Sequence, residues 1–232
     1  MTDIKTDLIG LTQDEIIESL ISNKLISEKE KFRAKQIWHW IYHHGETNIT
    51  KMATISNELR KQISKFYKIE RPVIENHQLS TDGTQKWLIK LEDNNLIETV
   101  FIPESNRGTL CVSSQVGCTL NCKFCFTGTQ TMVRNLTTQE ILSQLLLARD
   151  QLSDWPNTNQ RKISNIVFMG MGEPLYNYEN VKQATLIMGD KEGIKLSTKR
   201  ITLSTSGIVP QILNWGNEVD SRLAISLHAT ND

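Results

Sequence analysis

The strongest constraint on the fold is an alternation of short apolar runs and helical segments that begins at Gly108 in this 232-residue sequence. Strands are predicted at residues 110–114, 163–169, 201–204 and 223–227, and helices at 137–152, 178–188 and 210–215. Strands that alternate with helices form parallel β/α units, in which the helices cover the sheet. The pattern therefore predicts an α/β fold with about four such units.

Residues with unusual chemistry follow each of these predicted strands. A cysteine-rich loop comes after the first strand, and short polar or glycine-containing stretches at 170–174, 204–207 and 226–228 follow the other three. Parallel β/α folds bind their ligands at the carboxyl ends of the strands. We therefore expect these four segments to meet in one site.

Cysteine usage indicates metal or redox chemistry. All four cysteines lie between Cys111 and Cys125, whereas a secreted disulfide scaffold would spread them along the chain. The N-terminus has no basic stretch followed by an apolar one, so no secretory signal is predicted. No apolar run approaches the roughly 18 residues of a membrane span. We therefore expect a cytoplasmic protein that does not contact a membrane.

The cysteines at 118, 122 and 125 have C-x3-C-x2-C spacing. Three thiolates on one short loop can hold three irons of a 4Fe–4S cluster and leave the fourth iron without a protein ligand. Such an open iron can chelate the amino and carboxylate groups of S-adenosylmethionine. A zinc site completed by Cys111 is the alternative. One tight loop with no nearby histidine favours the open cluster.

The N-terminal part is expected to be helical and basic. Helices are predicted from a cap at Thr12, over 32–44 and over 56–67. The segment 24–71 contains 11 Lys and Arg but only 5 Asp and Glu, although the whole chain has no net charge. This asymmetry is typical of a small helical module that contacts nucleic acid. A solvated helical surface of mixed charge is the simpler interpretation of the same residues.

The second predicted helix contains a cluster of aromatic and imidazole side chains. Its members are Trp38, His39, Trp40, His43 and His44. Aromatic residues at this spacing usually belong to a helix core. We therefore set aside a metal site here and expect the histidines to lie at the surface or to face RNA.

Residues 73–107 change character again. Turn signals at 80–84 and 93–95 bound two strands, predicted at 86–91 and 97–102. We expect a β-meander that links the parts on either side. The predicted organisation is a helical accessory domain at 1–72, a linking meander at 73–107 and a β/α domain at 108–232.

Several motifs occur in a fixed order along the chain. They are RGTLCVSSQVGC at 107–118, CKFCFTG at 122–128, MGMGEPL at 169–175, TLSTSG at 202–207 and SLHA at 226–229. Together they resemble the RNA adenine methyltransferases of the RlmN type, in the radical S-adenosylmethionine superfamily. The segments QIWHWIY at 36–42 and DGTQKW at 82–87 extend the resemblance. It implies a partial (βα)6 radical-SAM barrel after the accessory domain and the meander.

The resemblance also implies an activity. Enzymes of this type methylate carbon 2 of an adenine in large-subunit ribosomal RNA, and many also act on transfer RNA. They use a 4Fe–4S cluster, S-adenosyl-L-methionine and two cysteines. One cysteine is methylated and then gives up a hydrogen to a 5′-deoxyadenosyl radical, and the other releases the product. Ribosomal RNA, tRNA and an electron donor such as flavodoxin are the implied partners of a monomeric protein.

The resemblance assigns roles residue by residue. Cys118, Cys122 and Cys125 match the cluster ligands. Cys111 matches the second catalytic thiol, and Glu98 matches the acceptor of the proton from carbon 2. The cofactor contacts are matched by Gly172, Glu173, Ser204, Ser226, Leu227 and His228.

Without the resemblance, three of these residues have simpler interpretations. Cys111 would be a buried strand cysteine, Glu98 an outward-facing strand carboxylate, and His228 a satisfied histidine at a strand end.

The methyl-carrying cysteine of the family lies far downstream, and no cysteine follows Cys125 in this sequence. We therefore expect an N-terminal part of a longer enzyme, inactive as a methyltransferase by itself. Two alternatives stay open. One is the related carbon-8 methyltransferase that confers antibiotic resistance. The other is a non-catalytic iron–sulfur or zinc module that binds RNA.

Overall fold

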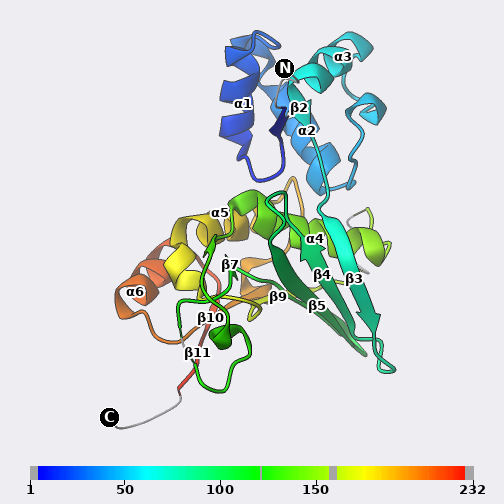
Figure 1. Cartoon of the computed structure of the whole chain (residues 1–232). Helices are drawn as coiled ribbons and strands as arrows, with labels where there is room; N and C mark the ends of the chain where they lie inside the picture. The colour runs from blue at the N-terminus through cyan, green and yellow to red at the C-terminus, as the bar shows by residue number, and fades with distance from the viewer. Residues whose placement is uncertain (1–4, 121, 157–160, 228–232) are drawn as a thin grey trace.

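The computed structural model describes residues 5–120, 122–156 and 161–227. A helical module lies at one end of the molecule, above a sheet covered by helices (Figure 1). The sheet and its helices confirm the predicted α/β class. None of the described helices is long and apolar enough to cross a membrane.

The helical module consists of α1 (Gln13–Ser22), α2 (Phe32–Tyr42) and α3 (Asn57–Phe66). The second and third helices agree with their predicted ranges to within two residues at each end, and the first begins directly after the predicted cap. Thr12 caps α1 through a reciprocal pair of hydrogen bonds with Glu15, and the Ser56 hydroxyl caps α3. Short parallel strands β1 (Thr6–Asp7) and β2 (Tyr67–Lys68) bring the two ends of the module together.

One seven-stranded sheet runs through the rest of the protein, in the order β11-β10-β9-β6-β5-β4-β3. Four strands are parallel, as the alternation predicts: β6 (Arg107–Cys111), β9 (Asn165–Phe168), β10 (Ile201–Thr205) and β11 (Arg222–Ile225). The other three pair in antiparallel fashion: β3 (Val73–Leu79), β4 (Gln85–Lys90) and β5 (Leu96–Glu104). The meander is therefore not only a link, because it extends the same sheet.

Strand β3 was not predicted as a strand. Its sequence, VIENHQL, has no alternation of apolar and polar residues, and most of its side chains are exposed. It lies at the edge of the sheet, where β4 is its single partner among the described strands. The His77 ring stacks on Trp87 of β4, with ring centroids 5.6 Å apart. Pairing with a neighbouring strand decides this element, and the local pattern does not reveal it.

The two faces of the sheet differ. Side chains such as Leu110, Ile166, Phe168 and Leu203 are buried, under a layer that includes α4 (Thr138–Gln151) and α5 (Tyr178–Gly189). Because successive residues of a strand point to opposite faces, the residues between them face the other side. That face carries the half-buried side chains from which a site can be built.

The remaining elements frame that side. Strands β7 (Gln115–Val116) and β8 (Arg134–Asn135) pair at the base of the cysteine loop. A short 3-10 turn, Pro174–Asn177, leads into α5, and α6 (Val209–Glu218) connects β10 to β11. Hydrogen bonds attach the helical module to the layer below at several points. Trp38 Nε1 donates to Asp190 at 2.9 Å, and Arg71 Nε donates to Asp150 at 2.7 Å.

Candidate active site

The cysteine loop brings the three predicted cluster ligands together. The backbone N–H of Cys125 donates to the carbonyl of Cys122 at 3.0 Å, and Leu120 N donates to Cys118 Sγ at 3.4 Å. The pKa of the Cys118 thiol is raised, first by burial and then by the neighbouring Cys122 and Cys125. The loop also closes tightly at its base. Gly117 has φ +77°, and a Cβ there would lie 2.2 Å from the Thr131 carbonyl.

The spacing of the thiols bears on which metal they could hold. Zinc binds thiolates at about 2.3 Å, so the sulfurs around one ion lie within ~4.6 Å of each other. Among the described residues, the three cysteines are not part of a side-chain group that could hold one metal ion. Three thiolates on one loop can instead each bind a different iron of an iron–sulfur cluster.

Cys111 ends β6, between Val100 of β5 and Val167 of β9. Burial raises the pKa of its thiol to about 11, against a smaller opposite effect of a hydrogen bond from the Met169 backbone. The side chain therefore stays protonated at neutral pH. It lies on the half-buried face of the sheet, at the end where the cysteine loop begins.

Glu98 lies on β5, on the same face as Cys111. Cys111 pairs with Val100, so Glu98 is its diagonal neighbour, a relationship that places Cβ atoms about 7 Å apart. The Glu98 carboxylate forms an ion pair with Lys86 of β4, with Nζ and Oε1 2.7 Å apart. The Ser113 hydroxyl donates to the Glu98 carbonyl at 2.7 Å. No feature of the sequence singles out Lys86 for a role at this site.

The segment after β9 packs against the segment after β6. Met171 N donates to the Ser113 hydroxyl at 2.9 Å. A Cβ on Gly170 would lie 2.7 Å from that same hydroxyl oxygen, so no larger residue fits without a shift. Gly172 has φ +98°, and a Cβ there would lie 2.5 Å from Gln115 Cβ. Both glycines therefore allow a close approach of backbone.

The Glu173 carboxylate is buried, with 3% of the residue exposed. One oxygen accepts a hydrogen bond from Leu175 N at 3.1 Å. The other accepts from the backbone N–H and the hydroxyl of Ser206, at 2.9 and 3.1 Å. The family resemblance implies that this carboxylate contacts a cofactor. In the structure its hydrogen bonds join the loops that follow β9 and β10.

The remaining predicted cofactor contacts come from β10 and β11. Ser204 is half-buried and lies two residues beyond Thr202, which pairs with Val167 beside Cys111. Ser226 N donates to the Thr205 carbonyl at 2.9 Å, just past the end of β11. Leu227 is 74% exposed. His228 lies outside the described residues.

Two fully buried glutamines support the site and were not predicted. Gln144 of α4 accepts hydrogen bonds from Thr99 Oγ1 at 2.6 Å and Ser113 N at 2.7 Å, and donates to the Ser113 carbonyl at 2.9 Å. Gln115 accepts from Glu173 N at 2.8 Å. A signal for Gln144 existed in the sequence, because it is a polar residue among the apolar positions of a predicted helix.

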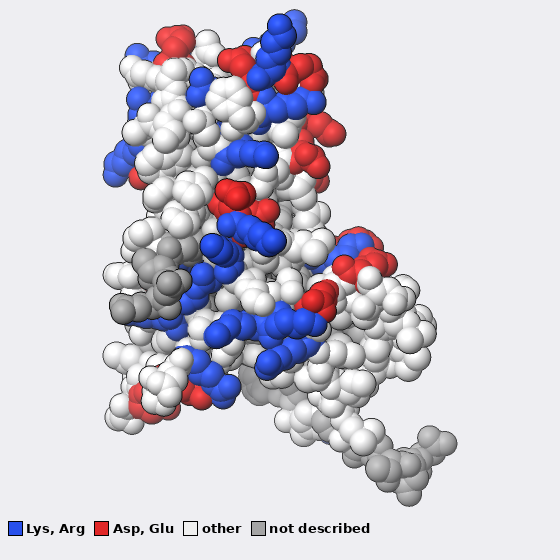
Figure 2. Space-filling view, turned by 180° about the vertical axis from the view of Figure 1, so that it is seen from behind, with Lys and Arg blue, Asp and Glu red and all other residues white. Residues whose placement is uncertain are grey.

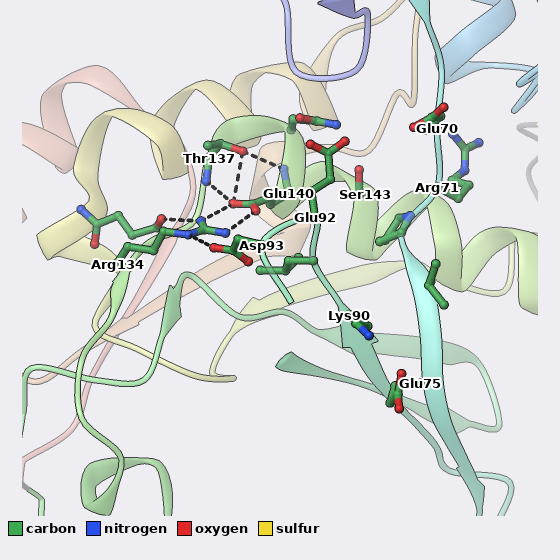
Figure 3. A pocket seen from close by; sticks show the side chains of 15 residues that line it. Glu70, Arg71, Glu75, Lys90, Glu92, Asp93, Arg134, Thr137, Glu140 and Ser143 are labelled. Atoms are coloured by element: carbon green, nitrogen blue, oxygen red, sulfur yellow. Dashed lines mark hydrogen bonds and ion pairs between the residues drawn. The ribbon is translucent and has the colours of Figure 1, made fainter. Parts of the chain in front are cut away.

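A separate cavity lies away from these residues (Figure 3). Its volume is about 720 Å³, and it is bounded by residues 70–73, the turn between β4 and β5, and the start of α4. Arg134 crosses one side and pairs with Asp93 and Glu140, each at 2.7 Å. None of the described residues that line this cavity is a predicted site residue. The candidate active site is instead the open sheet face beside the cysteine loop.

Comparisons with known proteins agree with this architecture. The family model of the ribosomal RNA large subunit methyltransferase N-terminal domain matches residues 6–69, and that of the Radical SAM superfamily matches residues 112–232. A solved radical SAM methyltransferase from Sphaerobacter thermophilus superposes with a TM-score of 0.87 and 36% identity. That alignment covers 98% of this chain and 65% of the other.

Curated relatives show the same combination. A protein of Mesorhizobium japonicum named dual-specificity RNA methyltransferase RlmN is 53% identical over 244 residues, and one of the same name from Rhodopseudomonas palustris is 51% identical over 243 residues. Each alignment covers 98% of this chain, and the chain spans about 60% of the length of these relatives. Because the Radical SAM model matches more than half of its residues, this chain belongs to the radical SAM superfamily.

Proposed function

We propose that this chain is the part of a radical S-adenosylmethionine methyltransferase that binds the cluster and the cofactor and acts on carbon 2 of adenine in large-subunit ribosomal RNA and in tRNA. The observation that carries the proposal is the arrangement at the carboxyl ends of β6 and β9. The cysteine loop, Cys111, Glu98 and the 170–173 segment all lie there. Relatives named RlmN favour the carbon-2 enzyme over the carbon-8 alternative.

The three loop cysteines would hold a 4Fe–4S cluster. Such a cluster supplies one-electron reduction of bound S-adenosylmethionine. The chain's own contribution is to position that cofactor. Gly172 allows the backbone to approach a ligand closely. The hydrogen bonds of Glu173 fix the loops on either side of it.

Glu98 and Cys111 would carry out the proton-transfer and thiol steps at the adenine ring. The Glu98 carboxylate takes the proton that leaves carbon 2, and Lys86 holds that carboxylate in place across the strands. Cys111 supplies the thiol that releases the product. Burial keeps this thiol protonated at neutral pH, because it raises the pKa of the thiol to about 11.

RNA binding is proposed for the helical module and the surface beside it. Residues 24–71 carry an excess of Lys and Arg, and Figure 2 shows Lys and Arg side chains in a band across the middle of the back face. Such a surface binds phosphates through electrostatic attraction. We also propose that the protein works in the cytoplasm as a monomer and receives electrons from a flavodoxin-type donor.

Cluster chemistry can be tested directly. The purified chain, reconstituted under anaerobic conditions with iron and sulfide, should contain about four iron and four sulfide per chain. It should also release 5′-deoxyadenosine from S-adenosylmethionine when reduced. Cys118→Ala should lose both properties, whereas Cys111→Ala should keep them. One zinc per chain with no sulfide would contradict the proposal and support a non-catalytic module.

The substrate and the position of methylation need a second experiment. A chimera that continues this chain with the remaining part of the Mesorhizobium relative should methylate carbon 2 of adenine in ribosomal RNA and tRNA. Mass spectrometry of nucleosides from the treated RNA separates 2-methyladenosine from 8-methyladenosine. A carbon-8 product would replace our proposal with the resistance-type activity.

A further inference from the structure

Three histidines converge at the carboxyl end of α2, outside the proposed active site. Their ligand atoms all lie within 4.8 Å of one another. The rings of His39 and His43 stack with centroids 4.3 Å apart, and His44 lies edge-on to both, at 5.0 and 4.9 Å. In the sequence, the neighbouring aromatic residues are typical of a helix core and argue against a metal site. Trp38 is indeed buried, but the imidazoles gather beside it.

The tautomer of His39 is suited to metal binding. Its Nδ1 lies 3.0 Å from the backbone carbonyl of Glu192. A carbonyl can only accept a hydrogen bond, so Nδ1 carries the proton and Nε2 keeps a free lone pair. Metal-binding histidines commonly donate their second N–H to a carbonyl in this way.

Some of the charges around the cluster favour a bound cation, and others oppose it. The carboxyl end of α2 carries the negative end of the helix dipole and attracts cations. Arg149 and Lys195 oppose a cation, because their charges also reach His43. The cluster therefore suits a cation that binds imidazole nitrogen strongly enough to outweigh the repulsion from Arg149 and Lys195.

We infer that His39, His43 and His44 bind one divalent transition-metal ion of the imidazole-preferring class, of which Zn²⁺ is the probe to use. Zinc binds imidazole nitrogen at about 2.0–2.1 Å, so two nitrogens on one ion lie within ~4.2 Å. Binding requires the stacked rings of His39 and His43 to turn out of their nearly parallel arrangement, so that a lone pair of each points at the same ion. Water can complete the coordination, since three protein ligands leave a position open.

The location suggests what the ion does. Trp38 and His39 of α2 already contact Asp190 and Glu192, in the segment that follows α5. An ion held by the three imidazoles would fix the end of α2 against that segment. It would therefore stiffen the contact between the helical module and the layer of helices below it (Figure 1). This inference does not depend on the proposed methyltransferase activity.

The test uses the full chain with Cys118, Cys122 and Cys125 replaced by Ala, so that the cysteine loop cannot take the metal. Calorimetry with Zn²⁺ should show one ion per chain and a rise in the unfolding temperature. His39→Ala and His44→Ala should each weaken Zn²⁺ binding by more than about tenfold. Even the loss of a residue that only hydrogen-bonds to a metal ligand lowers metal affinity ~10–100-fold. His77→Ala is the matched control, because this exposed ring stacks on Trp87 far from the cluster in sequence. It should leave binding unchanged.

The Lys195→Ala variant distinguishes between a site that binds a cation and one that binds an anion. Removing this positive charge should strengthen Zn²⁺ binding, whereas it would weaken binding of phosphate or RNA to the same imidazoles. Mg²⁺ should not bind, because it prefers oxygen ligands. The inference is overturned if the chain without loop cysteines takes up no stoichiometric Zn²⁺, or if binding survives both His39→Ala and His44→Ala. Weakened Zn²⁺ binding in Lys195→Ala would also contradict it. His44 is exposed, so its replacement tests the site without disturbing the fold.

Discussion

The buried carboxylate of Glu173 accepts two hydrogen bonds from Ser206, one from its backbone N–H at 2.9 Å and one from its hydroxyl at 3.1 Å. A third, from Leu175 N, occupies the other oxygen. Because Glu173 follows β9 and Ser206 follows β10, one side chain sets the spacing of two loops. Those loops come from neighbouring parallel strands, at the end of the sheet where the cysteine loop lies.

Glu173→Gln should destabilise the protein. An amide offers one acceptor and turns the other position into a donor, which then faces an N–H group. Leaving such buried groups unpaired costs about 1–3 kcal/mol. Denaturant unfolding measures the loss. Glu179→Gln is the control, because the Glu179 side chain is 77% exposed. Equal stability of the two variants would show that the Glu173 hydrogen bonds contribute nothing.

Gly172→Ala should disrupt the site more than the fold. The added Cβ would lie 2.5 Å from Gln115 Cβ, on a backbone with φ +98°. We expect the reconstituted variant to keep its iron and sulfide but to cleave S-adenosylmethionine at least about tenfold more slowly, an effect of ~1.4 kcal/mol. Gly216→Ala in α6 is the matched control, since a Cβ there meets nothing within 4 Å. That change should stabilise the helix by about 0.5–1 kcal/mol. Unchanged cleavage in Gly172→Ala would exclude a close approach of the cofactor at this loop.

Lys86→Met should affect proton transfer and leave stability almost unchanged. The ion pair with Glu98 is solvent-accessible, with side chains 38% and 43% exposed, and such pairs contribute about 0–1 kcal/mol. In the chimera we expect base methylation to fall by at least about tenfold, because a misplaced general base loses part of its ~10²–10⁴-fold effect. Formation of 5′-deoxyadenosine should continue.

Two further variants decide whether the ion pair is responsible. Lys86→Arg should restore part of the methylation, whereas Lys90→Met on the same strand should have no effect. Loss of cofactor cleavage in Lys86→Met would instead indicate a structural role for Lys86.

Cys111 should make stability depend on pH in the alkaline range. Burial raises its thiol pKa from 9.0 to about 11 in the folded state. The folded protein therefore holds a proton that the unfolded chain releases, and the free energy of unfolding falls as pH rises from about 9 to 11. Two pKa units correspond to at most ~2.7 kcal/mol. Unfolding measured from pH 8 to 11 should show a shallower decline in Cys111→Ala than in the original chain. Parallel curves would mean that the thiol is not shielded from water.

Local features of the sequence predicted much of the fold. The Thr12 and Ser56 caps mark where α1 and α3 begin. The four parallel strands appear in the sequence as short apolar runs between helices. Spacing alone placed three cysteines on one loop. Each of these signals lies within a few residues, where geometry follows directly from residue order.

Other features depended on contacts between distant segments. Strand β3 exists because β4 lies beside it, and Lys86 meets Glu98 because of the register of β4 on β5. Glu173 reaches Ser206, and Gln144 reaches Ser113, only through the packing of neighbouring strands and helices. No local pattern encodes such a partner.

The sequence by itself determined the class of fold, the order of its elements and the cysteine loop. Tertiary structure decided the register that places Glu98 diagonal to Cys111, and the packing that places His39 beside Glu192 in the segment after α5. The physical reason is the range of the forces involved. Helix caps and strand patterns act over a few residues, whereas register and side-chain convergence minimise the free energy of the whole packed core.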